Sequence, residues 1–456
     1  MTYLRVFAAC LAGLALTVAP ASAKVTIGEY QPMDHHTAHP YPALGSPELP
    51  SLTWSQEIHH PGATYIAVHF SRFELAPGDR VVVRSPDRSQ SKVYTNQGRR
   101  DLGTKGGFFA SRIHGDRAIV ELITHGGGSA YGLHIDKIGR GYNDQEILEF
   151  WELGLGEEMN LPQPKGWDRS VCTADDSTEA VCHENTEPAM YQEARAVARL
   201  VIQGAFSCTG WLVGCDGHIM TNEHCINSQV AADNTEYEWM AEGATCATNC
   251  ASGLACPGTV EAEAATLVAV SSPLDYALLI PDTSTGTGTD LVATYGYMQL
   301  REAGAVLDEQ IYIPQHPAGW GKRFAFNSTY PDDVALGGHT YATSLTEFAC
   351  SGGTNDVGYW ADTRGGSSGS PVLGVGDNLV VALHHCRGSN FCTTGGGSDT
   401  RNRGVPIEAV IADLGGDLPS CALGNATEIF LDGLEAGNCS AWSTVLGGAG
   451  TCAAAP

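Results

Sequence analysis

Short apolar runs separated by turn residues make up most of this chain, and stretches with helical periodicity are few. In the first third, the runs are rich in β-branched and aromatic residues, and sequences such as APGD and HGGG divide them. This pattern predicts strands at Thr64–Phe70, Arg80–Ser85, Arg117–Ile123 and Tyr131–Ile138. Strands at this spacing predict a small β-sandwich of about 100 residues. Ahead of it, the Pro- and His-rich segment Lys24–Pro50 is predicted to be an irregular leader.

The same pattern of short apolar runs between Gly-rich turns returns from Cys172 to Gly416. Helix signals there are confined to Pro188–Val201 and Pro406–Gly416. The pattern predicts a mainly β domain of about 245 residues, a size that suits two packed barrels. The Pro-containing stretch Asn160–Ser170 reads as a linker. We therefore predict domains at 24–165 and 171–416, followed by a Gly- and Ala-rich C-terminal extension at 417–456.

The first 23 residues have the features of a secretory signal peptide. Arg5 supplies a positive charge, Val6–Val18 an apolar run, and the sequence Ala-Ser-Ala a small-residue cleavage site ending at Ala23. The apolar run is too short for a helix that spans about 30 Å of hydrocarbon. We therefore predict residues 1–23 to be a signal peptide, with cleavage after Ala23, a secreted protein and no membrane partner.

Charge and cysteine content narrow the class of protein. The chain has 51 acidic and 25 basic residues, a formal charge of −26, and such a surface repels nucleic-acid phosphates, so we expect no nucleic-acid partner. Of the 15 cysteines, Cys10 lies in the signal peptide and the other 14 all lie from Cys172 onward. An even number of cysteines in an exported chain favours disulfide bonds.

Metal binding has little support in the sequence. The pair Cys246 and Cys250 resembles half a zinc site, but no matching pair with histidine follows it. Four histidines occur as two adjacent pairs in the leader and a turn, where we interpret them as solvated side chains: His35, His36, His59 and His60. We expect no metal and no other cofactor.

The stretch TRGGSSGSPV at Thr363–Val372 is either a flexible turn or a tight loop that holds a nucleophile. A nucleophile needs a base. His224 directly precedes Cys225, and a bridge from Cys225 to Cys208 would fix its backbone within reach of a hydroxyl. Asp275 is the only charge entering the apolar strand in SPLDYALLIP, and a carboxylate there can fix the tautomer of a histidine.

These stretches resemble the chymotrypsin-like, or trypsin-fold, serine peptidases. TNEHC, DYALL and GSSGSP stand where that family has its His, Asp and Ser motifs, in the same order. The resemblance implies two β-barrels with a catalytic triad of His224, Asp275 and Ser368 between them. It also implies an oxyanion hole formed by the amides of Gly366 and Ser368. The implied activity is endopeptidase hydrolysis of protein or peptide substrates through an acyl-enzyme.

Within that family, the sequences IPQHPAGWGKRF, GSSGSPVL and VVALHHC are similar to the exported bacterial lysyl and glutamyl endopeptidases. This narrower resemblance implies the disulfides Cys172–Cys392 and Cys182–Cys256. Residues 24–165 hold the place of the family's N-terminal propeptide, so the protein is expected to be a zymogen with an intramolecular propeptide. The alternative is that residues 24–165 are a permanent accessory domain.

The chain also departs from the family pattern. Asn222 and Glu223 replace small residues before the histidine, and Ser367 replaces an aspartate before the nucleophile. That aspartate pairs with a newly cut N-terminus in vertebrate enzymes, so activation by that route is not expected here.

Two interpretations of substrate preference remain open. A pocket for Lys or Arg needs a buried carboxylate. Asp399 is the preferred candidate and Asp362 the second, and we expect cleavage after Lys or Arg. His384 with Thr363 supports the alternative, a Glu-specific enzyme, because glutamyl endopeptidases use a histidine and small hydroxyls.

Two other function classes are alternatives to an active serine peptidase. One is a catalytically inactive homologue that acts as an extracellular binding or adhesion module. Another is a metal-dependent hydrolase that uses the leader histidines, which a chelator would inhibit.

Overall fold

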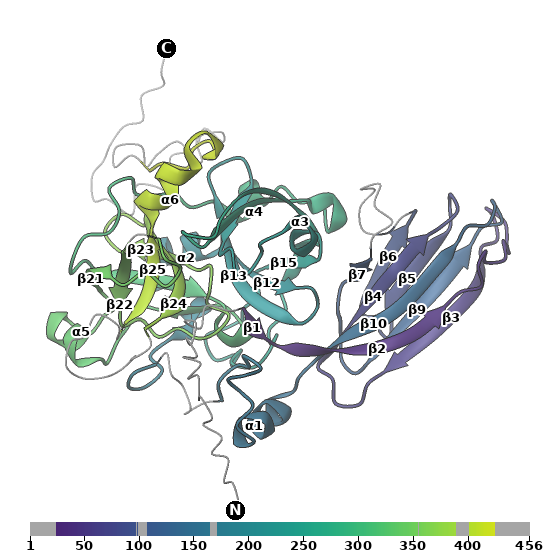
Figure 1. Ribbon diagram of the computed structural model, residues 1–456, viewed down its shortest axis with the longest axis horizontal. Helices are drawn as coiled ribbons and strands as arrows, with labels where there is room; N and C mark the ends of the chain where they lie inside the picture. Colours follow the sequence, from purple (N-terminus) through teal and green to yellow (C-terminus); the bar gives the residue numbers. More distant parts are fainter. Residues whose placement is uncertain are drawn as a thin grey trace, which may run out of the picture.

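The computed structural model describes residues 24–96, 98, 107–164, 171–353, 355–388 and 401–424. These residues form two antiparallel β regions that lie side by side in Figure 1. The predicted fold class, mainly β, is confirmed. The predicted signal peptide and residues 425–456 lie outside the described residues.

The N-terminal region is a sandwich of two sheets with strand orders β2-β10-β4-β7, to which β8 adds at β4, and β3-β9-β5-β6. Side chains from both sheets form its core, among them Val68 and Phe70 of β4 and Val120 and Leu122 of β9. The strands are β2 (Gly28–His36), β3 (Ser51–His59), β4 (Tyr65–Glu74), β5 (Arg80–Arg84), β6 (Ser91–Thr95), β7 (Phe108–Phe109), β8 (Ile113–His114), β9 (Arg117–Thr124) and β10 (Gly132–Gly141).

The prediction of an irregular leader over Lys24–Pro50 is wrong for much of its length, because β2 lies within it. Successive residues of β2 alternate between partly buried and exposed, as in a strand with one covered face. The covered positions are filled by residues such as Glu29, Gln31 and Met33, not by β-branched residues. Glu29 pairs with Arg140 of β10 at 2.6 Å, so partners on the neighbouring strand stabilise a strand with low intrinsic propensity.

The C-terminal region has two eight-stranded sheets among the described residues. The first has the order β16-β15-β12-β13-β14-β18-β17, with β1 added at β13, and the second has the order β11-β20-β19-β23-β24-β25-β22-β21. The first contains β1 (Val25–Thr26), β12 (Val197–Ile202), β13 (Phe206–Val213), β14 (His218–Thr221), β15 (Thr235–Trp239), β16 (Thr259–Ala262), β17 (Ala265–Ser271) and β18 (Tyr276–Pro281). The second contains β11 (Thr178–Glu179), β19 (Ile311–Gln315), β20 (Arg323–Ala325), β21 (Ala342–Glu347), β22 (Asp356–Tyr359), β23 (Pro371–Gly374), β24 (Val380–Arg387) and β25 (Asn402–Pro406).

Helices are short in the described part of the chain, and none is long and apolar enough to cross a membrane. The predicted helix Pro188–Val201 is only half correct, because α2 ends at Ala194 and β12 begins at Val197. All six residues of β12 are buried, and the β-branched residues among them suit a covered strand better than a helix. The helices are α1 (Asp144–Glu152), α2 (Pro188–Ala194), α3 (Gln229–Ala232), α4 (Leu291–Tyr295), α5 (Pro331–Leu336) and α6 (Ile407–Leu414).

Buried polar contacts join the N-terminal sandwich to the first of these sheets. The guanidinium of Arg112 pairs with Glu236 and, at 2.6 Å, with Glu238, and the side chain of Arg112 is only 3% exposed. The carboxylate of Glu263 pairs with the ammonium of Lys92 at 2.6 Å and accepts a hydrogen bond from the hydroxyl of Tyr94 at 3.1 Å. These pairs link residues far apart in the sequence and fix the two regions against each other.

Candidate active site

His224 and Asp275 are brought together by the pairing of β14 with β18. The register Thr221↔Ala277 places the residues that follow β14 beside those that precede β18. His224 lies in the turn after β14, and Asp275 directly precedes β18. The side chain of Asn222 donates a hydrogen bond to the main-chain oxygen of Asp275 at 2.8 Å, which fixes the two turns to each other.

The contacts between the two residues have the geometry of a base and its orienting carboxylate. Oδ1 of Asp275 accepts the main-chain N–H of His224 at 3.0 Å, and Oδ2 lies 2.8 Å from Nδ1 of the imidazole. Because a carboxylate accepts hydrogen bonds, this contact places the proton on Nδ1 of the neutral ring and leaves Nε2 as the basic nitrogen.

The carboxyl group of Asp275 is ionised at neutral pH. Burial alone raises its pKa, but the charge of His224 and the hydrogen bonds from His224 and His385 outweigh burial, so the pKa of Asp275 lies below its usual value. The positive φ of 44° at Asp275 belongs to the tight turn that aims the side chain at the histidine. An ionised carboxylate in this position stabilises an imidazolium that forms on His224.

Ser368 lies in the loop between β22 and β23, on the second sheet. Its main-chain oxygen accepts the N–H of Thr209 of β13 at 2.9 Å and lies 3.9 Å from Sγ of Cys225. The residue after it, Gly369, has φ +88°, and a Cβ there would lie 2.1 Å from the main-chain oxygen of Thr209. The close approach therefore requires glycine, and it brings the serine loop against the disulfide next to His224.

The loop before Ser368 directs backbone N–H groups toward one side. The main-chain oxygen of Gly365 accepts the N–H of Ala318 at 2.6 Å, and the N–H of a trans peptide points opposite its C=O. The N–H of Gly366 is therefore turned away from Ala318. Among the described residues, neither this N–H nor that of Ser368 donates a hydrogen bond. Two unused donors in one loop are what an oxyanion hole requires.

The candidate specificity residues have different surroundings. Asp362 is buried; Oδ2 accepts the N–H of Asp176 at 2.7 Å, and burial above all raises the pKa of Asp362 to about 8. Nδ1 of His384 lies 2.8 Å from the hydroxyl of Tyr359, and burial above all lowers the pKa of His384 to about 3. Asp399 lies outside the described residues.

The structure corrects part of the expected disulfide pattern. Cys208–Cys225 forms, with 6.3 Å between the Cα atoms. The expected pair Cys182–Cys256 does not form, since Cys182 bonds to Cys246 across a Cα separation of 4.6 Å. Cys256 instead closes a six-residue turn with Cys250 at 5.6 Å, also inside the range that a disulfide spans.

The remaining described cysteines form two further disulfides, and Cys172 is bonded as well. Cys215–Cys421 and Cys350–Cys386 are also present, and neither pair was predicted from the sequence. Cys172 is disulfide-bonded, whereas its expected partner Cys392 lies outside the described residues.

Three groups of described residues bring potential metal ligands within 4.8 Å of one another. Two of these groups, one around His224 and one around His385, owe their sulfur atoms to disulfides, and a disulfide sulfur is not the thiolate that binds a metal. The third group, Asp34, His36 and His134, lies on the exposed face of the N-terminal sandwich.

Sequence reasoning missed two polar residues beneath the candidate site. His385 is fully buried and contacts Asp275 at 3.2 Å and Asp356 at 2.9 Å. The available signal was the second histidine of VVALHHC within an otherwise apolar strand. A buried ionisable residue needs a partner, but the sequence does not tell which carboxylate supplies it.

The chain is similar to known proteins over much of its length. The family model of the trypsin-like peptidase domain matches residues 208–383. The secreted RxLR effector protein 73 of Plasmopara viticola is 42% identical over 333 residues, which cover 72% of this chain and 75% of that protein.

Similar solved structures are more distant. A Glu endopeptidase is 19% identical with a TM-score of 0.35, over 53% of this chain and 96% of that chain. The HtrA-type protease AlgW with a tripeptide is 16% identical with a TM-score of 0.34, over 50% of this chain. The match spans 62% of that protease, less than two thirds of its length. Given its identity with the Plasmopara viticola protein, the chain belongs to the same family as secreted RxLR effector protein 73, and it carries a trypsin-like peptidase domain.

Proposed function

We propose that the protein is a secreted serine endopeptidase whose triad is His224, Asp275 and Ser368. The observation that carries the proposal is the double contact of Asp275 with His224, through the main-chain N–H and through Nδ1. This contact leaves Nε2 of His224 as the base and supplies the ionised carboxylate that such a base needs.

The reaction then follows from these roles. Nε2 of His224 takes the proton of the Ser368 hydroxyl as Oγ attacks the substrate carbonyl carbon, and the carbonyl oxygen becomes an oxyanion. The N–H groups of Gly366 and Ser368 are proposed to donate to that oxygen, each contributing about 3–4 kcal/mol to transition-state stabilisation. The imidazolium gives its proton to the leaving amine, and water later hydrolyses the acyl-enzyme by the same proton transfers.

Within this function we favour cleavage after Lys or Arg. Among the described residues, the carboxyl group of the buried Asp362 forms no ion pair, and its raised pKa of about 8 keeps it largely protonated at neutral pH. A substrate cation beside it would lower that pKa and ionise the carboxyl group. Asp399 is the second candidate for this role.

The Glu-specific alternative has weaker physical support. The pKa of His384 is lowered to about 3, first of all by burial, so its ring is neutral at physiological pH. A neutral ring offers a substrate carboxylate one N–H and no positive charge, and Nδ1 already contacts Tyr359. Stabilising a buried carboxylate requires charge or several donors.

The test of activity uses the purified secreted protein and a peptide library whose cleavage sites are read by mass spectrometry. The proposal predicts hydrolysis by the native protein and none above background by Ser368→Ala with an unchanged far-UV spectrum. Equal hydrolysis by Ser368→Ala would overturn the proposal. A folded protein that cleaves nothing, both before and after proteolytic cleavage at 165–170, favours the inactive binding module.

The same library tests the specificity. Cuts after Lys or Arg that are lost in Asp362→Asn support the role of Asp362, and cuts that persist in that variant transfer the role to Asp399. Cuts after Glu that are lost in His384→Ala would establish the Glu-specific alternative instead.

We also propose that residues 24–165 restrain the site as an intramolecular propeptide after export. The supporting contact is β1, which pairs Val25 with Ser207 of β13. A Cβ on Gly365, in the serine loop, would lie 3.2 Å from Val25, so the segment lies against that loop. A protease site inserted at 165–170 tests this: cleavage followed by a rise in kcat/KM supports the propeptide, and unchanged kcat/KM supports an accessory domain.

A further inference from the structure

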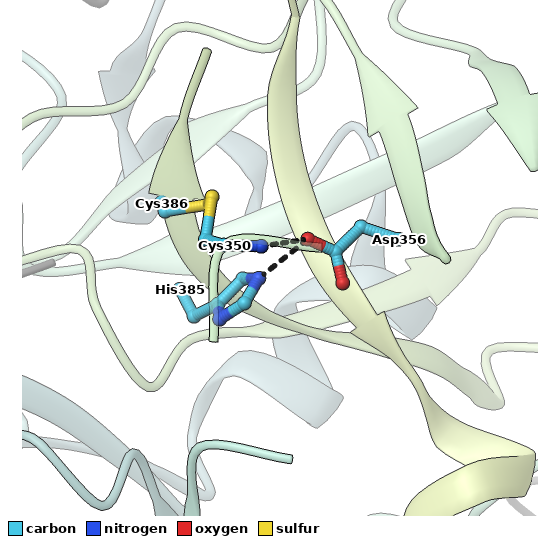
Figure 2. Close-up of side chains that lie close together, drawn as sticks. All are labelled: Cys350, Asp356, His385 and Cys386. Atoms are coloured by element: carbon cyan, nitrogen blue, oxygen red, sulfur yellow. Dashed lines mark hydrogen bonds and ion pairs between the residues drawn. A yellow bond between two sulfur atoms is a disulfide. The ribbon is translucent and has the colours of Figure 1, made fainter. Parts of the chain in front are cut away.

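His385 is completely buried behind the carboxylate that orients His224. It lies on β24, and its side chain contacts carboxylates at both ends. Nδ1 lies 3.2 Å from Oδ2 of Asp275, and Nε2 lies 2.9 Å from Oδ2 of Asp356. Figure 2 shows the contact of His385 with Asp356 and the adjacent Cys350–Cys386 bond.

These contacts define the protonation state of the ring. A carboxylate oxygen only accepts hydrogen bonds, and a neutral imidazole has a single N–H. Both nitrogens of His385 face such oxygens, so the ring that satisfies both contacts is the imidazolium. Burial lowers the pKa of His385, but the hydrogen bonds and charges of Asp275 and Asp356 outweigh burial and raise the pKa to about 9.

The backbone around His385 is arranged to place this ring. β24 pairs His384 with Gly404 and Cys386 with Arg403, so His385 is the extra residue of an irregularity in the register. An extra residue in one strand re-aims its side chain. Here the side chain is aimed under the candidate site toward Asp275.

A second set of contacts fixes Asp356. Its Oδ2 accepts the main-chain N–H of Cys350 at 3.1 Å. The Cys350–Cys386 disulfide ties that residue to the neighbour of His385. Arg403 of β25 lies 3.7 Å from Sγ of Cys350, and Glu347 of β21 pairs with Arg403 at 3.9 Å. The disulfide therefore clamps His385 and its outer carboxylate together.

We propose that His385 is a positioning residue for the triad. The ring of His385 holds the carboxylate of Asp275 from the side opposite His224, and Asp356 holds the ring of His385. Oδ2 of Asp275 contacts Nδ1 of both rings, at 2.8 Å for His224 and 3.2 Å for His385. The proposal rests on the proposed peptidase function. It adds a chain His224–Asp275–His385–Asp356, in which two histidines alternate with two carboxylates.

The positive ring has a consequence for catalysis. A cation beside Asp275 offsets part of the negative charge with which that carboxylate stabilises an imidazolium on His224, and loss of the cation would strengthen that stabilisation. The charged and titratable groups around His385 are Asp275, Asp356, His384, His224, Arg403 and Glu347. Asp275 and Asp356 are the ones that contact it directly.

The kinetic test compares His385→Gln and Asp356→Asn with His339→Gln, a histidine on the loop that contacts Asn327. We expect His385→Gln to lower kcat by about ten- to a hundredfold through misplacement of the base, with KM within about twofold. We also expect the acid limb of kcat/KM to move up by about one pH unit. Asp356→Asn should give a smaller change of the same sign, and His339→Gln none. An unchanged kcat and acid limb in His385→Gln would overturn the proposal.

A second measurement does not depend on activity. In full-length Ser368→Ala labelled with 15N-histidine, the ring resonances that disappear in His385→Gln belong to His385. The proposal predicts that both of its nitrogens stay protonated up to about pH 8. A neutral ring at pH 7 would overturn the proposal whether or not the protein is a peptidase. Conversely, an imidazolium in a protein that cleaves nothing before and after cleavage at 165–170 would reject the proposed function and leave the structural arrangement standing.

Discussion

At the scale of single residues, Asp275 carries the largest number of site contacts. It accepts two hydrogen bonds from His224, contacts His385, and is tied by Asn222 through its main chain. Its contact with a buried partner was predictable from the sequence because a single charge at the entrance of an apolar strand needs a partner. The identity of its second partner was not predictable, because His385 is 110 residues away in the chain.

Asp275→Asn should lower kcat by about 10⁴. Asparagine presents an amide N–H₂ or a single uncharged oxygen to the histidine. The tautomer that carries its proton on Nδ1 and has a basic Nε2 is therefore no longer stabilised by a carboxylate. The measurement is steady-state hydrolysis of the best library peptide.

The matched control for Asp275→Asn is Asp136→Asn, which changes another His–Asp pair. Asp136 lies 2.5 Å from His69 in the N-terminal sandwich, and its substitution should leave kcat unchanged. Equal losses in the two variants would show that the effect of Asp275→Asn is not specific to the site.

At the scale of elements, the loop between β22 and β23 has the special glycine conformation that the sequence indicated. Its glycines and serine stand at fixed offsets, and the resemblance assigned each a role. Gly366 has φ +96°, and a Cβ there would lie 3.0 Å from the main-chain oxygen of His316. Both the φ value and the lack of space restrict this position to glycine.

In Gly366→Ala the added Cβ should shift the backbone and move this N–H away from the oxyanion. We therefore expect kcat to fall by about 10²–10³ with little change in KM, as when one oxyanion donor is lost. Steady-state kinetics measures this. Gly376→Ala is the control, because no atom lies within 4 Å of a Cβ at that exposed turn position, and it should keep native kcat. A Gly366→Ala enzyme with native kcat would exclude this N–H from the oxyanion hole.

Other elements were predicted less well, for reasons visible in their residues. Four strands of the sandwich were predicted close to their true bounds because they are short runs rich in β-branched residues between turn residues. β2 was missed because its covered face holds Glu29, Gln31 and Met33, whose partners lie on other strands. β12 was predicted as the end of a helix because Pro188 begins a helix that ends sooner than its apolar run.

At the scale of the whole molecule, the sequence predicted two β regions but not how they pack. The contact depends on pairs such as Arg112 with Glu238 and Lys92 with Glu263, each more than 120 residues apart. Nothing local to Arg112 distinguishes it from an exposed arginine. Long-range pairing of this kind is fixed by the fold and has no pattern in the sequence.

Arg112→Ala should destabilise the packing of the two regions by about 3–5 kcal/mol, because it leaves the buried carboxylate of Glu236 without its cation and removes one of the two cations that pair with Glu238. Thermal unfolding and limited proteolysis measure this, and we expect a lower Tm and faster release of the N-terminal region. Arg117→Ala is the control, since the side chain of Arg117 is 43% exposed in its pair with Glu57 and should contribute less than about 1 kcal/mol. Equal Tm values for the two variants would contradict a structural role for Arg112.

The central claim is that Ser368 is a nucleophile activated by His224. The most direct measurement is reaction of the native protein with a fluorophosphonate, followed by mass spectrometry of the peptide that contains Ser368. If His224 activates Ser368, a single adduct forms on Ser368 of the native protein and none forms on Ser368→Ala. The reaction of His224→Ala is strongly slowed. A folded native protein that forms no adduct at Ser368, before and after cleavage at 165–170, would contradict it.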